Sequence, residues 1–163
     1  GREGLLNVRL IAVGKLGERY LAEGCAEYQK RLGAFCRLEL VELPEARLAE
    51  KPSEAQIEAA LSKEAEQVLE RAKGSYLIAL CVEGRAMPSK ALSERLSKLA
   101  VDGISAVSFV IGSSFGLSPR VKAAADLCLS MSEMTFPHQL MRLMLLEQLY
   151  RAFSITAGGK YHK

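Results

Sequence analysis

The spacing of apolar residues alternates along the chain between the period of a strand and the period of a helix. Four short apolar runs are typical of strands buried on both faces. They cover residues 8–14, 76–82, 106–111 and 127–131. In a fifth segment, 35–43, Cys36, Leu38 and Leu40 alternate with charged residues, which predicts a half-exposed strand.

Helical spacing separates these strands. Ser53 and Gln56 have the spacing of a capping box, and the periodic stretch behind them stops at Gly74. Ser118 and Pro119 suit the N-cap and first turn of a short helix. The predicted helices cover 15–33, 53–74, 88–103, 118–125 and 137–153. Strands that alternate with helices predict a parallel α/β sheet, in a single domain spanning residues 1–163.

The last predicted helix is apolar on almost every side. Its apolar residues are Leu140, Met141, Leu143, Met144, Leu145, Leu146, Leu149, Tyr150 and Phe153. A helix that is apolar all round must be buried on most sides. We expect it to pack against the sheet on one side and a second subunit on the other, in a homodimer. The alternative is a core helix within a monomer.

The composition is that of a soluble globular protein, with 49% apolar and 25% charged residues. No run approaches the ~18 apolar residues of a membrane span, and no signal peptide precedes the first strand, so we expect a cytoplasmic protein without a membrane partner. The four cysteines are widely spread, which favours reduced thiols, and no cluster has the spacing of metal ligands.

The net charge of +3 is unevenly distributed. Residues 119–163 hold six Lys or Arg against three Asp or Glu, while residues 1–118 hold sixteen of each, so the excess lies in the C-terminal quarter. This asymmetry is compatible with an anionic partner such as RNA. A chance imbalance would explain the asymmetry equally well.

Three loops follow the ends of the third, fourth and fifth predicted strands, at 83–85, 112–116 and 132–137. Ligands of open α/β sheets bind outside the carboxyl ends of the strands. Glycines in such loops permit close approach to a small molecule, although they also serve simple tight turns.

The sequence of residues 112–116 also matches the G-x-S-x-G nucleophile elbow, with Ser114 as the nucleophile. Asp126 or Glu133, followed by His138 or His162, completes the chain order of a serine hydrolase. Against this alternative, an elbow requires a helix that begins at about the serine, whereas the helix signal here is Ser118.

Both histidines lie near the C-terminus. His138 begins the last helix and Arg142 lies one turn later, so both side chains project from the same face. The imidazole could accept a proton and the guanidinium could hold a phosphate or an anionic base, while a His that merely caps the helix is the alternative. Tyr161 and His162, in a basic tail, could stack on a base and pair with phosphate.

Taken together, these residues resemble the small bacterial large-subunit rRNA methyltransferases of the knotted SPOUT superfamily, which methylate N3 of a pseudouridine. The resemblance covers essentially the whole chain. Its matching stretches are 10–14, 27–28, 111–112, 116–119, 122–125, 135–138, 149–156 and 161–162.

The resemblance implies a SPOUT fold with a C-terminal trefoil knot, which general connection rules would exclude. It also implies S-adenosyl-L-methionine as cofactor, a homodimer that buries the last helix, and 23S rRNA of the assembled ribosome as substrate. The residues that the resemblance assigns to the cofactor are Leu80, Cys81, Gly112, Ser113, Gly116, Ser132, Glu133, Met134, Thr135, Phe136 and Pro137. Those it assigns to the RNA and the reaction are His138, Arg142, Tyr161 and His162.

One position departs from the family. Its glycine loop usually reads Ile-Gly-Gly, whereas this chain has Ser113 at the third position. A serine would be strained there if the position requires a positive φ, although its hydroxyl could instead bind the ligand.

The implied mechanism is in-line attack of the pseudouridine N3 on the methyl group, after loss of the N3 proton to His138, His162 or water. Positioning of the two reactants would supply most of the catalysis. A non-catalytic RNA-binding dimer is a third alternative.

Overall fold

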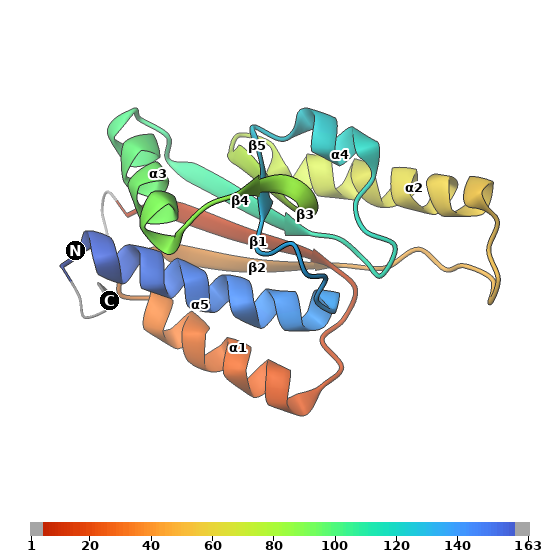
Figure 1. The fold of residues 1–163 in the computed structure, drawn as a ribbon, viewed down its shortest axis with the longest axis horizontal. Helices are drawn as coiled ribbons and strands as arrows, with labels where there is room; N and C mark the ends of the chain where they lie inside the picture. Colours follow the sequence, from red (N-terminus) through yellow and green to blue (C-terminus); the bar gives the residue numbers. More distant parts are fainter. Residues whose placement is uncertain (1–4, 159–163) are drawn as a thin grey trace.

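The chain forms a five-stranded parallel sheet, as the sequence pattern predicts (Figure 1). The computed structural model describes residues 5–158. The strands have the order β2-β1-β4-β3-β5, so β1, β4 and β3 lie inside the sheet and β2 and β5 at its edges. The strands are β1 (Asn7–Val13), β2 (Arg37–Leu43), β3 (Tyr76–Ala86), β4 (Ala106–Ile111) and β5 (Leu127–Ser130).

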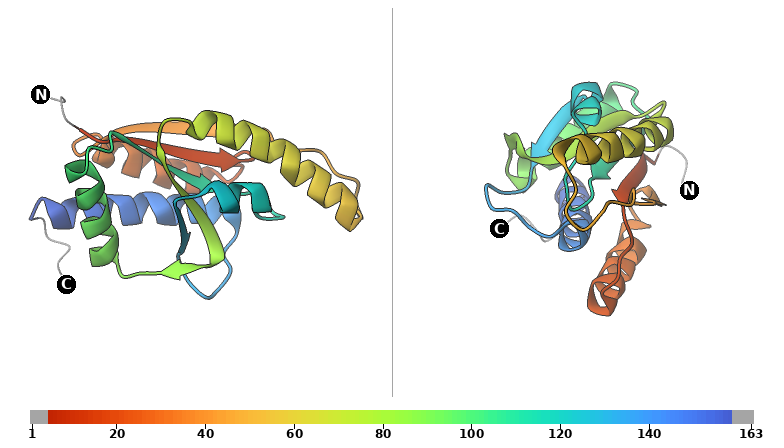
Figure 2. Two further views of the ribbon diagram at one scale, coloured as in Figure 1. Left: turned by 90° about the horizontal axis from the view of Figure 1, so that it is seen from above. Right: turned by 90° about the vertical axis from the view of Figure 1, so that its right-hand side faces the viewer.

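Helices cover both faces of the sheet (Figures 1 and 2). The helices are α1 (Arg19–Leu32), α2 (Glu54–Ala72), α3 (Ser89–Val101), α4 (Pro119–Ala124) and α5 (His138–Thr156). Residues of α1, α3 and α5 share one apolar cluster with the sheet, and residues of α2 and α4 share another. The result is a three-layer α/β/α domain, in which each fully buried Leu, Ile or Phe contributes roughly 1.5–3 kcal/mol.

The local signals read from the sequence correspond to real caps. The Ser53 hydroxyl accepts from the Gln56 N–H, and the Gln56 side chain accepts from the Ser53 N–H, so the capping box at the start of α2 is confirmed. The Ser118 hydroxyl caps α4 by accepting from the Arg120 N–H. Because these caps satisfy N–H groups that a helix leaves unpaired, they fix where α2 and α4 begin.

Helix α5 is covered by the sheet and by α1 and α3. Its buried residues include Leu145, Leu146 and Leu149, which have no exposed surface. Tyr150 packs edge-on against Tyr28 of α1, with ring centroids 6.0 Å apart. On the other side, the Ser93 hydroxyl of α3 donates to the Ala152 carbonyl over 2.7 Å. Every residue from His138 to Ile155 is buried or half-buried within the single chain.

Strand β3 differs from the prediction by extending to Ala86 rather than ending at residue 82. Its pairing with β5 is interrupted, because Leu129 of β5 pairs with both Leu80 and Arg85. The residues between them bulge out of the ladder, and the strand then resumes. The trefoil knot implied by the resemblance stays a prediction.

Candidate functional site

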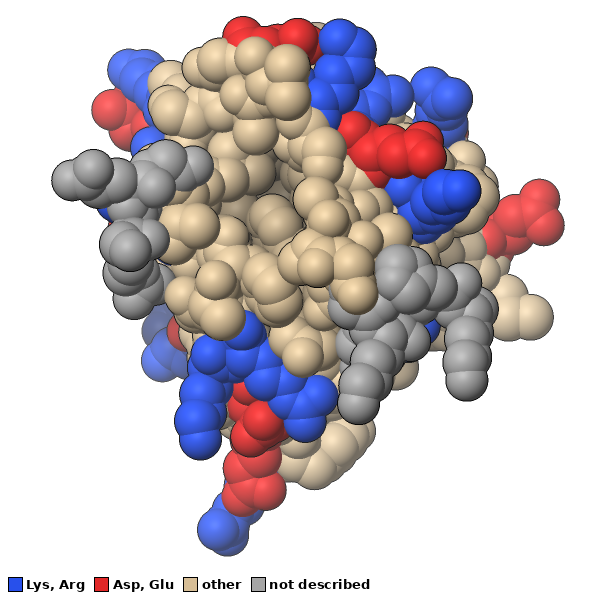
Figure 3. All heavy atoms as spheres, turned by 90° about the vertical axis from the view of Figure 1, so that its left-hand side faces the viewer, with Lys and Arg blue, Asp and Glu red and all other residues tan. Residues whose placement is uncertain are grey.

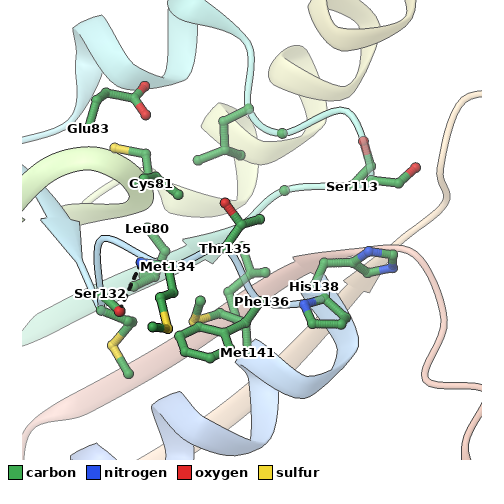
Figure 4. A pocket seen from close by; sticks show the side chains of 18 of the residues that line it. Leu80, Cys81, Glu83, Ser113, Ser132, Met134, Thr135, Phe136, His138 and Met141 are labelled. Atoms are coloured by element: carbon green, nitrogen blue, oxygen red, sulfur yellow. Dashed lines mark hydrogen bonds between the residues drawn. The ribbon is translucent and has the colours of Figure 1, made fainter.

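A cavity of about 620 Å³ opens at the carboxyl ends of β3, β4 and β5. Its walls are the β3 bulge, the loop after β4, the segment after β5 and the first turn of α5. Figure 4 shows Cys81 and Glu83 at one side of this cavity and His138 at the other. The location is where an open parallel sheet is expected to bind a ligand, and the volume lies in the usual range for small-molecule sites.

The β3 bulge forms the first wall, through Cys81, Val82 and Glu83. The bulge returns to the sheet at Gly84, where an added Cβ would lie 2.7 Å from the Cys128 carbonyl carbon. Only glycine permits backbones to approach this closely. Gly84 therefore fixes how far the bulge projects towards the cavity.

The loop after β4, residues 112–116, forms the second wall, and we call it the glycine loop. A Cβ on Gly112 would lie 2.3 Å from the Gly116 carbonyl oxygen, so no side chain fits. The Gly116 N–H donates to the Ser113 carbonyl over 2.8 Å, and Gly116 has φ +85°. Within residues 5–158 no residue other than glycine has a positive φ, so Ser113 is unstrained. The concern that a serine would distort this loop is wrong.

The third wall is the segment of residues 131–137. The Ser132 hydroxyl accepts from the Met134 N–H over 3.0 Å (Figure 4). The Ser130 hydroxyl donates to the Ser132 carbonyl over 2.9 Å. Met131, Met134 and Phe136 give this wall an apolar surface. The side chain of Met134 is exposed although it borders the cavity.

An ion pair between Glu83 and Lys122 spans the rim of the cavity. Its hydrogen bond, more than any other cause, lowers the pKa of Glu83. Nearby, burial and the adjacent Cys128 thiol raise the pKa of Cys81 to about 11. Cys81 is therefore protonated at neutral pH and serves as an apolar wall rather than a nucleophile.

His138 is the first residue of α5, directly after the N-cap Pro137, and its side chain borders the cavity. Gly14, the residue after β1, lies beside it. A Cβ on Gly14 would lie 3.9 Å from the His138 Nε2. The imidazole is thus placed beside any ligand that the cavity holds.

Arg142 does not face a substrate, contrary to the sequence-based expectation. It is 3% exposed, its guanidinium pairs with Glu42 of β2, and it donates to the Gly14 carbonyl over 3.2 Å. Because its charge is compensated inside the protein, Arg142 braces the end of β1 instead of holding a phosphate.

The serine hydrolase alternative is wrong. The Ser114 hydroxyl is exposed and donates to Glu45, not to a histidine, and α4 begins five residues later. Asp126 is engaged elsewhere, because it accepts from the Leu77 N–H over 2.8 Å.

Residues 6–162 match the profile of a family described as "Predicted SPOUT methyltransferase". The chain belongs to the SPOUT methyltransferases. This chain is 46% identical to the protein of Streptococcus suis, and 44% identical to the protein of Leuconostoc citreum, that are named Ribosomal RNA large subunit methyltransferase H. Both alignments span 159 residues, 97% of this chain and 100% of each relative.

Solved structures agree on the fold. A probable methyltransferase from Bordetella pertussis superposes with a TM-score of 0.60 at 16% identity, over 93% of this chain and 97% of that one. A probable methylase family protein from Haemophilus influenzae gives 0.55 at 15% identity, over 97% of this chain and 70% of that one. At identities this low, the two superpositions support the SPOUT fold and nothing more specific.

SPOUT methyltransferases use S-adenosylmethionine, and the cavity fits such a ligand. Gly112 and Gly116 border the cavity without side chains, so a ligand there can bond to their backbone groups. Met131, Phe136 and Met141 offer an apolar surface for a purine ring. Within the described residues no His, Cys, Asp or Glu are grouped to hold a metal ion, and no helix is long and apolar enough to cross a membrane.

The structure brings together most of the residues that the sequence assigned to the site. The assigned residues that border the cavity are Leu80, Cys81, Gly112, Ser113, Gly116, Ser132, Met134, Thr135, Phe136, Pro137 and His138. Glu133 is exposed and does not line the cavity, and Tyr161 and His162 lie outside the described residues. The bordering residues that the sequence assignment missed are Val82, Glu83, Ile111, Ser114, Leu117, Lys122, Met131 and Met141.

Proposed function

We propose that this protein transfers a methyl group from S-adenosylmethionine to N3 of a pseudouridine in 23S rRNA of the assembled ribosome. The observation that supports this most strongly is the cavity at the carboxyl ends of β3, β4 and β5, where the glycine loop and an apolar wall line it and His138 lies at its edge. The curated relatives over the same length bear the name of a large-subunit rRNA methyltransferase.

Different residues of the cavity have different roles in such a reaction. The bound cofactor supplies an electrophilic methyl group. The glycine loop and residues 131–137 hold the cofactor, and their apolar side chains exclude water from it. His138, at the edge of the cavity, accepts the N3 proton as general base. Tyr161 and His162 contribute to holding the RNA. Positioning of the reactants supplies most of the rate enhancement.

Docking on an assembled particle suits the surface charge. The end of the molecule shown in Figure 3, opposite the carboxyl ends of β1 and β4, has basic and acidic side chains interspersed around an uncharged centre. A net charge of +3 gives weak, unspecific attraction to RNA. Recognition therefore relies on a preformed surface of the ribosome.

We expect a second copy of the chain to pack on the half-buried residues of α5 that the sheet, α1 and α3 leave accessible. Leu140 and Met144 lie one turn apart and are half-buried, and neither belongs to the apolar cluster around α5. In a homodimer these side chains become buried. Sedimentation equilibrium is expected to give the mass of two chains, and a single-chain mass would refute the dimer.

The function is tested with methyl-labelled S-adenosylmethionine and ribosomes from cells that lack this methylation. We expect label on a single pseudouridine of the 23S rRNA, and much slower labelling by His138→Ala with unchanged cofactor affinity. Label on free 23S rRNA but not on ribosomes would contradict the substrate. No label and no cofactor binding would refute the methyltransferase activity and favour an RNA-binding dimer.

A further inference from the structure

Helix α5 begins at His138 without the kind of cap that starts α2 and α4. Its N-cap is Pro137, no side chain within residues 5–158 caps it, and its first turn contains no acidic residue. A cap normally satisfies the first N–H groups of a helix and fixes where the helix begins. The position of His138 is therefore set by contacts from the side of the helix.

Two side chains at the start of α5 make these lateral contacts. The Gln139 side-chain oxygen accepts from the Gly17 N–H over 2.9 Å. The Arg142 guanidinium pairs with Glu42 of β2 and donates to the Gly14 carbonyl over 3.2 Å. Both contacts join the helix to segments at least 100 residues earlier in the chain, at the carboxyl ends of β1 and β2.

The placement of Arg142 is costly. The residue is 3% exposed, and its Nε is buried without a hydrogen-bond partner among the described residues. A buried ion pair gains little stability over apolar side chains of the same size, and an unpaired buried N–H costs free energy. Stability alone therefore does not account for an arginine at this position, whereas its geometry does offer a function.

Gly14 connects Arg142 to His138. Its N–H donates to the Leu43 carbonyl over 2.8 Å, which ties it to the end of β2, and its carbonyl accepts from Arg142. A Cβ on Gly14 would lie 3.9 Å from the His138 Nε2. Because Arg142 follows His138 by one helical turn, fixing the guanidinium against Gly14 also fixes the first turn of α5 and the imidazole that it carries.

We propose that Arg142 is a positioning residue, which with Glu42 and the Gly14 carbonyl sets where the imidazole of His138 lies at the edge of the cavity (Figure 4). We call Arg142, Glu42 and Gly14 the α5 anchor. The inference rests on the proposed function, since it takes His138 as the general base. Arg142 does not line the cavity, so it acts on the reaction only through His138.

The test is a double-mutant cycle on the labelling of ribosomes that lack this methylation. Arg142→Met should lower kcat by about tenfold to hundredfold, because a small misplacement of a reacting group has effects of that size. Its affinity for S-adenosylhomocysteine in calorimetry should stay within about twofold of the wild type. In the His138→Ala background, Arg142→Met should cause no further loss, since the residue that it positions is gone.

The pH dependence distinguishes positioning of the base from a merely structural role. At high pH the pseudouridine N3 loses its proton without a general base. The kcat deficits of Arg142→Met and His138→Ala should therefore both shrink as pH rises. Arg142→Lys should recover only part of kcat, because an ammonium group keeps the charge but lacks the fork that reaches Glu42 and Gly14 together.

Glu42→Gln is the second variant, in case Arg142→Met does not fold. The Glu42 side chain is 46% exposed and its amide replacement still accepts a hydrogen bond, so we expect a folded protein with a severalfold loss of kcat in the wild-type background only. Arg71→Met is the matched control, because Arg71 of α2 pairs with Glu39 of the same strand β2 and does not border the cavity. It should label ribosomes like the wild type.

Two results would overturn the α5 anchor. One is that Arg142→Met and Glu42→Gln both fold and keep the kcat of the wild type. The other is that their losses are the same with and without His138, or do not change with pH. The proposed function fails separately, if the wild-type chain transfers no label to the ribosome. Circular dichroism and thermal unfolding establish that each variant is folded before it is compared.

Discussion

The two facing walls of the cavity are built in different ways. The glycine loop is held at its start, where Gly112 and Ser113 are buried, and by the Ser114 hydroxyl, which donates to Glu45. The segment of residues 131–137 is held mainly within itself, by the hydrogen bonds of Ser130 and Ser132, and residues 133–135 are exposed. A ligand thus finds one wall preformed and has to order the other, which rests on few buried contacts.

We expect the largest loss of ligand affinity when the backbone contact inside the glycine loop is disturbed. Gly112→Ala places a methyl group 2.3 Å from the Gly116 carbonyl oxygen, so the loop must move. Overpacking of this kind costs about 1–3 kcal/mol, which, where it falls on binding, corresponds to a roughly fivefold to 150-fold loss of S-adenosylhomocysteine affinity in calorimetry.

Gly17→Ala is the control for this experiment, because a Cβ there meets its nearest neighbour at 3.8 Å, an ordinary contact. The control should bind like the wild type. A folded Gly112→Ala variant with wild-type affinity would show that the preformed wall does not contact the ligand.

We expect a smaller loss of ligand affinity when the segment of residues 131–137 is altered. Ser132→Ala removes the hydroxyl that accepts from the Met134 N–H. Loss of one such hydrogen bond costs about 0.5–1.5 kcal/mol, so affinity for S-adenosylhomocysteine should fall roughly twofold to tenfold.

Thermal unfolding of Ser132→Ala should match that of Ser105→Ala, an exposed serine at the far end of the sheet. If Ser132→Ala instead lowers the unfolding temperature strongly while affinity is kept, the segment is part of the core, and the contrast between the two walls is lost.

The smallest expected effect is a change in pH dependence. Burial raises the pKa of Glu64 in the folded protein, so folding favours its protonated form. The stability linked to this group is fully present below the unfolded pKa of about 4.3 and is lost as pH rises through the folded pKa.

Glu64→Gln abolishes that titration. In urea unfolding between pH 4 and 7, the free energy of unfolding of the wild type should fall relative to the variant as pH rises. Parallel pH curves for the two proteins would mean that Glu64 titrates alike in the folded and unfolded states.

Local patterns were sufficient to predict the elements of this fold. All five strands and all five helices lie where apolar periodicity, the Ser53 capping box and Ser118 placed them, with ends shifted by a few residues. These features depend on residues close in the sequence. The order of the strands does not, since β4 lies between β1 and β3, and no local pattern specifies that insertion.

The site was predicted where glycines and a helix start identify it, and missed where distant residues meet. Gly112 and His138 were found because they stand next to strand and helix boundaries. Arg142 was misplaced, because helical spacing sets its face but not its partner Glu42, 100 residues away. Glu45 had no signal, because it lies in the exposed connection between β2 and α2, and its partner Ser114 is 69 residues away.

The close contact at Gly84 has a consequence for how this protein tolerates mutation. Gly84 does not line the cavity, yet every replacement would push a side chain into the backbone of β5. Saturation mutagenesis scored by activity alone would rank Gly84 beside Gly112 as if both touched the cofactor. Scoring the same library by protein abundance would show how much of each loss comes from folding, since a side chain at either position meets backbone atoms.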